Sequence, residues 1–311
     1  MTSPRRQIGD SLTVGGYKAG SLLAKLLPSP VATLVSGGLA APVAVGMGDR
    51  RRMIERHIRR VVPWASDARV RRLVLQSFET YTRYYMESFR LPSLTAEQVR
   101  RGMRLEGFED HVLGALAEGR GAIIALPHLG GWEWAGRWLA DQGIGVTVVV
   151  EPLDPPELFE WFAELRRRFG MNVVPLGPDA AIEVGSALAR NDVVCLLCDR
   201  FISGSGVAVD FFGEKTLLPA GPAMLSLRTG APLIPAAVYF DGRGSDHLAV
   251  VRPAVRHERS GARLREEVRD MTAKLAIELE HLIRRAPDQW HLFQPNWPSD
   301  PGYPHSLEGH R

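Results

Sequence analysis

The pattern of hydrophobic and polar positions changes near residue 105. Beyond it, short runs of consecutive apolar residues alternate with amphipathic segments of about a dozen residues. Solid apolar runs are typical of strands buried on both faces, and their alternation with helices predicts an α/β fold with a largely parallel sheet and helices on both faces. The predicted strands are 121–127 (GAIIALP), 145–151, 171–177, 192–199 (DVVCLLCD), 231–240 and, as an edge strand, 247–256.

The amphipathic segments between these runs predict helices. Their apolar residues recur at three- and four-residue spacing, as one buried helix face requires. A loop is expected over 201–218, because no helical pattern continues there. The predicted helices are 108–120, 132–143, 155–170, 180–191, one starting within 219–230 (PAGPAMLSLRTG), and 261–285.

Residues 67–90 predict a long helix before the α/β part of the chain. Asp67 is placed to cap its first turn, and Pro92 follows its end. Phe78, Tyr81, Tyr84 and Tyr85 form an aromatic stripe at helical spacing. The stripe belongs either to the core or to the wall of an acyl or sugar groove.

The first 66 residues are predicted to be an apolar and basic helical segment that contacts a membrane and packs on the main domain, which residues 67–311 form as an α/β domain. Residues 11–27 have helical apolar spacing with two lysines and end at Pro28. Residues 31–48 are uncharged but hold four glycines and Pro42. We expect a helical hairpin there, in the core or at a membrane surface, rather than a span.

The net charge of the chain is small, but positive charge is concentrated in one segment. The chain carries a net charge of +3, yet residues 50–72 contain nine arginines against Glu55 and Asp67, so the remainder is acidic. Such a cluster indicates an anionic surface or a phosphorylated ligand as partner. Cys195 and Cys198 lie in a predicted buried strand and point to opposite faces, so neither a redox nor a metal role is expected.

The stretch PHLGGWEWAG, residues 127–136, carries the candidate chemistry. His128 follows a predicted strand, at the sheet edge where ligands bind in open α/β sheets. A regular helix would hold His128 and Glu133 apart, but the intervening glycine pair permits a tight turn. We therefore predict His128 as a general base and Glu133 as the carboxylate that orients it.

Several reaction types lack support in the sequence. There is no G-x-S-x-G elbow, no Walker loop and no G-x-G-x-x-G after a strand, and too few ligands surround His128 for zinc. The remaining chemistry is direct attack by an activated alcohol on a bound electrophile. An acyl thioester fits, because it is reactive enough to need no covalent enzyme intermediate.

Four further residues are candidates for substrate binding. Glu151 ends a predicted strand and either binds sugar hydroxyls or is a plain loop acid. Arg166 lies on the helix before the next strand, and would form a bidentate fork on phosphate if it faces the site. Asp199 and Arg200 stand at a strand's carboxyl end, where we favour a functional role.

Three blocks in order resemble one family. PHLGGWEWAG, the segment from Cys198 to Ala236 and PDQWHLFQPNW are similar to the glycerolipid acyltransferase superfamily, in the branch of the lipid A biosynthesis lauroyl acyltransferases. Within that branch the blocks most resemble the phosphatidylinositol mannoside acyltransferases. The family pattern has Asp or Glu at the position of Glu133. Arg200 departs from the Gln that often follows the residue matching Asp199, which leaves its role open.

The resemblance implies an acyl-CoA donor, a mannosylated phosphoinositide lipid as acceptor and His128 as general base on a mannose hydroxyl. It implies no metal and no cofactor beyond acyl-CoA as co-substrate, and no nucleic acid partner. The expected location is peripheral or monotopic, at the anionic cytoplasmic face of the plasma membrane. Two alternatives remain: a thioesterase or lipid esterase in which His128 activates water, and a non-catalytic lipid-binding protein.

Overall fold

The computed structural model describes residues 29–152, 155–242, 244–257 and 263–304. Seven of its strands form one sheet in the order β1-β9-β8-β2-β5-β3-β4. Neighbouring strands are parallel except β8 and β9, so the predicted largely parallel sheet is confirmed. The strands of the sheet are β1 (Met103–Glu106), β2 (Ala122–Leu126), β3 (Val146–Val150), β4 (Asn172–Pro175), β5 (Val193–Leu197), β8 (Leu233–Asp241) and β9 (Asp246–Val251).

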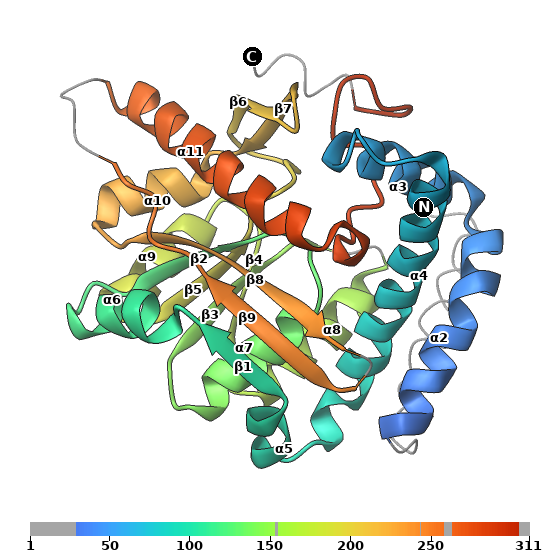
Figure 1. The fold of residues 1–311 in the computed structure, drawn as a ribbon. Coiled ribbons are helices and arrows are strands. Elements are labelled where there is room, and N and C mark those ends of the chain that lie inside the picture. Colours follow the sequence, from blue (N-terminus) through green and yellow to red (C-terminus); the bar gives the residue numbers. More distant parts are fainter. Residues whose placement is uncertain (1–28, 153–154, 243, 258–262, 305–311) are drawn as a thin grey trace, which may run out of the picture.

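Helices cover both faces of the sheet, as Figure 1 shows. The long helices are α2 (Ser29–Gly46), α3 (Gly48–Val61), α4 (Asp67–Arg90) and α11 (Leu264–Arg285). The helices that connect strands are α7 (Trp132–Asp141), α8 (Pro156–Arg168), α9 (Ala180–Ala189) and α10 (Gly221–Thr229). Shorter turns are α5 (Ala96–Arg101), α6 (Gly114–Ala117), η1 (Leu91–Ser93), η2 (Glu109–Leu113) and η3 (Pro287–Gln289).

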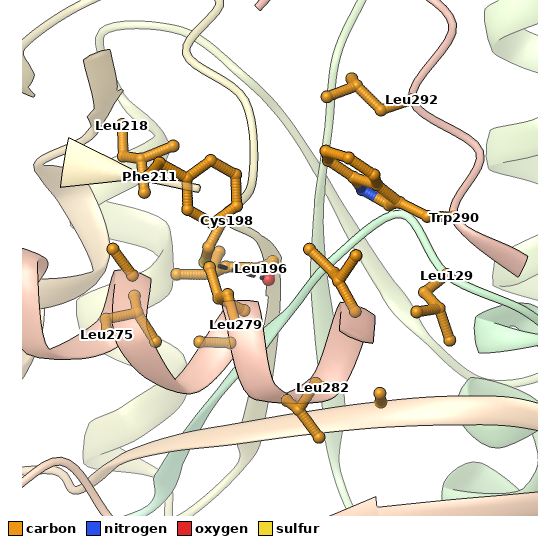
Figure 2. Close-up of a cluster of buried hydrophobic side chains, with 14 of the residues drawn as sticks. Leu129, Leu196, Cys198, Phe211, Leu218, Leu275, Leu279, Leu282, Trp290 and Leu292 are labelled. Carbon is orange, nitrogen blue, oxygen red and sulfur yellow. Dashed lines mark hydrogen bonds between the residues drawn. The ribbon is translucent and has the colours of Figure 1, made fainter. Parts of the chain in front are cut away.

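The alternation of side chains along the central strands divides the interior into two cores. On β2, Ile123 and Ala125 belong to the core beneath α10 and α11, while Ile124 and Leu126 face the core beneath α7. Figure 2 shows the first of these cores, where leucines of α11 pack toward Cys198 and Phe211. Because both faces are apolar and covered, the strands read as solid apolar runs.

Two predictions, one about the edge of the sheet and one about residues 201–218, are wrong. Strand β9 lies inside the sheet, since the unpredicted β1 pairs outside it as the edge strand. The predicted loop 201–218 contains an antiparallel hairpin, β6 (Gly206–Phe211) and β7 (Glu214–Pro219), turning at Phe212 and Gly213 with φ of 52° and 77°. The hairpin is stable against the core because Phe211 and Leu218 are fully buried.

The N-terminal prediction is corrected in part. Helix α2 runs continuously through Pro42 and packs along α4, so residues 31–48 do not form a hairpin. Ser66 caps α4 with its hydroxyl, and Asp67 is the first helical residue instead. No helix in the described ranges is both long enough and apolar enough to cross a bilayer. The prediction for residues 11–27 falls outside the described residues, and the domain boundary after residue 66 stays a prediction.

Candidate active site

His128 stands two residues beyond β2, which lies in the middle of the sheet between β5 and β8. The glycine pair after it is required by crowding. Gly130 has a φ of +63°, and a Cβ there would lie 2.0 Å from the carbonyl oxygen of Val238. A Cβ on Gly131 would lie 2.5 Å from the ring of His247. The loop therefore turns tightly against β8 before α7 begins.

The imidazole of His128 is paired with the carboxylate of Asp199. Its Nδ1 lies 2.6 Å from Asp199 Oδ1, and its backbone N–H donates to Oδ2 at 3.0 Å. Asp199 stands two residues beyond β5, the strand that pairs with β2. The parallel register thus brings the two residues together at the carboxyl edge of the sheet, as expected for neighbouring parallel strands.

Asp199 is fully buried and holds its charge through hydrogen bonds. Burial disfavours the charged form, but the charge and hydrogen bonds of His128 and the indole N–H of Trp290 outweigh it and lower the pKa of Asp199. An ionised carboxylate can only accept, so Nδ1 of His128 carries the proton. In the neutral imidazole, Nε2 is then the bare nitrogen, and the His128 side chain is 23% exposed, so a substrate can reach it.

The structure gives Glu133 different partners from those expected. Its carboxylate accepts from Arg166 Nε at 3.1 Å and from Arg166 Nη2, and from the Tyr84 hydroxyl at 3.2 Å. The orienting partner of His128 is Asp199 instead, because α7 starts at Trp132 and holds Glu133 in its buried first turn beside α4 and α8. A catalytic role for Glu133 stays a prediction.

The environment of Glu133 is strongly polarised. Burial and the Glu133 charge raise the pKa of the Tyr84 hydroxyl well above its ordinary value. Burial would lower the pKa of Arg166, but the Glu133 carboxylate outweighs this effect and raises it. Arg166 is therefore a permanent cation in the wall of the site, with its charge balanced by Glu133.

Glu151 and Arg200 form the third pair. Arg200 Nη2 lies 3.1 Å from each oxygen of Glu151, so the contact bridges the ends of the adjacent strands β3 and β5. The six residues predicted from the sequence are thus joined as three acid–base pairs at one edge of the sheet. Their substrate-binding roles stay predictions.

A cavity of about 310 Å³ connects five of these six residues, and Asp199 lies buried behind His128. At its polar end are His128, Glu133, Glu151, Arg166 and Arg200. From there the cavity continues between the sheet and α7. Its apolar walls come mainly from the strands and from α7, and they include Ile124, Leu126, Val148, Cys195, Leu197, Ala236, Val238, Ala249, Val251, Ala135, Gly136, Trp138 and Leu139.

The aromatic stripe on α4 divides between the two predicted locations. Phe78 is fully buried in the core, whereas Tyr81, Tyr84 and Tyr85 line the cavity. Tyr84 also stacks on Trp132, with ring centroids 4.2 Å apart. Three of the four rings therefore form a wall of the site.

Sequence reasoning missed the contribution of the C-terminal segment. The backbone N–H of His291 donates to the carbonyl of His128 at 2.7 Å, and the His291 ring lines the cavity. Burial, with the nearby His128, lowers the pKa of His291 to about 3, so this ring is neutral at physiological pH. The signal was present in the block PDQWHLFQPNW, which carried the family resemblance but was given no role at the site.

The two cysteines behave as apolar residues. Burial raises the pKa of Cys195, on the cavity wall, to about 12, and it also raises that of the fully buried Cys198. A thiolate at either position is therefore disfavoured at neutral pH. In the part of the chain that the structure describes, no three His, Cys, Asp or Glu residues gather in a metal-binding arrangement.

Comparison with known families decides the class of protein. Residues 6–299 match the family model of the bacterial lipid A biosynthesis acyltransferases. The chain belongs to this family. Its members are acyltransferases, so the cavity with His128 at its polar end lies in an acyltransferase of this family.

Two relatives refine the comparison within the acyltransferase family. The phosphatidylinositol mannoside acyltransferase of Mycolicibacterium smegmatis is 37% identical over 302 residues, which cover 96% of this chain and 95% of that protein. The phosphatidylinositol mannoside acyltransferase of Mycobacterium tuberculosis (strain H37Rv) is 36% identical over 301 residues, which cover 96% and 92%. The resemblance noted from three sequence blocks is thus confirmed along nearly the whole chain.

Proposed function

We propose that this acyltransferase transfers a long fatty acyl chain from acyl-CoA to a mannose hydroxyl of a phosphatidylinositol mannoside. One observation carries the proposal: the His128–Asp199 pair stands at the polar head of an apolar cavity that runs beneath the sheet. The names of the two relatives support the acceptor. We propose a thioester donor because it is reactive enough to need no protein nucleophile, and the two cysteines, Cys195 on the cavity wall and the buried Cys198, are disfavoured as thiolates.

The proposed reaction is a single displacement on the thioester. Nε2 of His128 takes the proton of the sugar hydroxyl while the oxygen attacks the thioester carbonyl. The new C–O bond forms, the C–S bond breaks, and the thiolate leaves. The imidazolium, stabilised by Asp199, returns its proton to the departing sulfur. The products are an acylated sugar and the free thiol of CoA.

The apolar part of the cavity supports a long acyl chain as substrate. Its walls are mostly aliphatic and aromatic side chains, and the charged groups among its lining residues are few. Burying a chain there contributes about 0.8 kcal/mol per methylene group. The geometry thus separates an apolar binding region from a polar reaction centre.

Arg50 is the cation best placed to meet a phosphate of either substrate. Arg166 and Arg200 are already neutralised by carboxylates, so their attraction for a phosphate is reduced. Arg50 lines the cavity from the start of α3, and no carboxylate partner for it lies within the described residues. Its exposed guanidinium can therefore turn to a phosphate without breaking an ion pair.

We further propose that the α2–α3 region rests on an anionic membrane surface. Val45 is 78% exposed on α2, and Trp64 is 70% exposed after α3. Arg50 and Arg51 at the start of α3 add positive charge beside the cavity. Exposed aromatic and apolar residues next to arginines favour the interface of an anionic bilayer. With acyl-CoA as donor, this is the cytoplasmic face of the plasma membrane.

An acyl-transfer assay tests the proposed function. The purified full chain is given labelled palmitoyl-CoA with or without phosphatidylinositol mannoside in lipid vesicles, and products are identified by mass spectrometry. We expect an acceptor-dependent acylated glycolipid, and a loss of at least about 10²-fold in rate for His128→Ala. Release of free fatty acid regardless of acceptor would indicate a thioesterase. Lipid binding without turnover would indicate a lipid-binding protein, and either result contradicts the proposal.

A further inference from the structure

The C-terminal segment after α11 pairs with the loop that carries His128. Gln289 accepts a hydrogen bond from the Gly130 N–H at 2.9 Å, and the His291 N–H donates to the His128 carbonyl at 2.7 Å. Between these bonds, Leu129 and Trp290 form an antiparallel bridge. The loop is therefore held on one side by β8 and on the other by a segment about 160 residues away in sequence.

Trp290 also reaches the carboxylate that orients His128. Its Nε1–H donates to Asp199 Oδ2 at 2.7 Å, and both residues are almost completely buried. Figure 2 shows the indole in the same apolar core as Leu129. Asn296 adds a second contact, because its amide Nδ2 donates to the Asp199 backbone carbonyl at 3.1 Å.

These contacts fix the direction of the carboxylate. Oδ2 accepts from Trp290 and from the His128 backbone N–H, so Oδ1 is left facing the imidazole Nδ1. Without the indole N–H, Oδ2 would lose one of two donors in a buried site, where a carboxylate keeps a fixed direction only if its hydrogen bonds are satisfied. The indole thus does more than fill space.

The segment itself is anchored to α3 by a buried acid. Asp300 accepts from the backbone N–H groups of Asn296 at 2.9 Å and Trp297 at 3.1 Å. It also lies 2.8 Å from Arg60 Nη1 and 3.2 Å from His57 Nε2. This anchor holds the backbone on either side of Asn296, so the segment cannot slide along Asp199 without breaking buried polar contacts.

We propose that Trp290 is a positioning residue of the acyl transfer, acting through Asp199 on His128. The inference rests on the proposed role of His128 as general base. It adds Trp290 as the residue that keeps the Asp199 carboxylate oriented toward His128. Trp290 is not among the residues that line the cavity, so we expect it to contact neither substrate. It should therefore affect the rate of the chemical step rather than substrate binding.

Trp290→Phe tests this inference, with Trp297→Phe as the matched control. Both tryptophans are buried in the same segment and each donates one indole hydrogen bond, but Trp297 donates to the Phe211 carbonyl at 3.1 Å and not to Asp199. We expect Trp290→Phe to lower kcat by about 10- to 10²-fold, the loss typical of a misaligned catalytic group, with an unchanged KM for acyl-CoA. Trp297→Phe should lower the melting temperature to a similar extent but leave kcat near wild type.

A second variant covers the case in which Trp290→Phe fails to fold. Sulfur in place of the Trp290 ring N–H, introduced as a benzothienyl side chain, removes the donor and keeps the shape, and should give the same loss of kcat. Equal effects of the two phenylalanine variants on kcat, or full activity of the sulfur variant, would overturn the inference. If the wild-type chain gives no acceptor-dependent transfer, the proposed function itself has failed, and that outcome is read independently of Trp290. If His128→Ala retains full transfer activity, the general-base role of His128 fails, and this inference fails with it.

Discussion

Replacing Asp199 by asparagine separates the two carboxylates that compete for the role of His128 partner. The carboxylate of Asp199 accepts three N–H donors, from His128 Nδ1 at 2.6 Å, the His128 backbone at 3.0 Å and Trp290 Nε1 at 2.7 Å. Asparagine has nearly the same shape but only one acceptor oxygen. At least one donor must therefore face an amide NH2, and the negative charge beside the imidazolium is lost.

The size of the effect follows from these losses. One hydrogen bond to a charged group contributes about 1.5–3 kcal/mol, and a buried donor left without an acceptor costs about 1–3 kcal/mol. We take about 3–5 kcal/mol of this lost free energy as stabilisation of the transition state. Since about 1.4 kcal/mol corresponds to a factor of ten, the rate should fall by roughly 10²- to 10⁴-fold. Acyl-CoA binding should persist, because Asp199 lies behind His128 and outside the cavity.

Single-turnover transfer from labelled acyl-CoA measures this loss, with Glu133→Gln as the comparison. Glu133→Gln breaks the pair with Arg166 and leaves a buried cation, so it should reduce stability by about 3–5 kcal/mol while the fraction that folds retains more activity than Asp199→Asn. Near-normal turnover in Asp199→Asn together with an inactive, folded Glu133→Gln would refute the assignment of Asp199. It would return the role to Glu133.

Four other predictions concern stability, the cavity and the membrane. Gly130→Ala should lower stability by several kcal/mol, more than the roughly 1–3 kcal/mol of a left-handed alanine alone, because its Cβ would meet the Val238 carbonyl at 2.0 Å; thermal unfolding measures this. Hydrogen bonds from His57 and the Asn296 N–H, with the charge of Arg60, outweigh burial and hold the pKa of Asp300 below its ordinary value. Its stabilisation should thus be present above about pH 4 and be lost as pH falls further, and Asp300→Asn should flatten this acid dependence in unfolding curves. Ala236→Leu narrows the cavity and should reduce kcat/KM for long-chain relative to short-chain acyl-CoA, by about fourfold for each methylene group excluded, in a chain-length series. Trp64→Ala should weaken co-sedimentation with anionic vesicles, because an exposed aromatic anchor is removed.

Each of these predictions has a control or an outcome against it. Gly143→Ala has a similar positive φ of +76° with nothing within 4 Å of the new Cβ, so it should cost clearly less than Gly130→Ala. If the loss of stability at low pH is the same in Asp300→Asn and wild type, Asp300 does not contribute to the pH dependence of stability. A parallel loss for all chain lengths in Ala236→Leu would mean misfolding rather than selection. Equal vesicle binding by Trp64→Ala and wild type would exclude Trp64 as an anchor.

The sequence was sufficient for the parts of the fold in which local pattern and tertiary structure agree. Strands such as β2 and β5 are buried on both faces, so their apolar runs were unambiguous. Strand β1 escaped notice because only its first residue, Met103, is buried and the other three are exposed. The hairpin β6–β7 was missed because its six-residue strands alternate weakly and its partner surface comes from distant helix α11.

The site shows the same division between local and distant information. The position of His128 and its tight turn followed from the strand and the glycine pair. The partner of His128 could not be identified in this way. Glu133 is near His128 in sequence, whereas Asp199 is brought near only by the pairing of β2 with β5. The position of Asp199 at a strand end makes it a candidate, but its contact with His128 depends on strand order, which periodicity does not reveal.

The bridge between Leu129 and Trp290 has a consequence for biosynthesis. A ribosome makes His128 and Asp199 long before it reaches the residues that brace them, so the emerging polypeptide holds a reactive imidazole without its full support. Competence for acyl transfer should therefore arrive late and abruptly, once the stretch through Asp300 has left the exit tunnel and docked. Unfinished chains would then consume thioesters much more slowly than the folded protein.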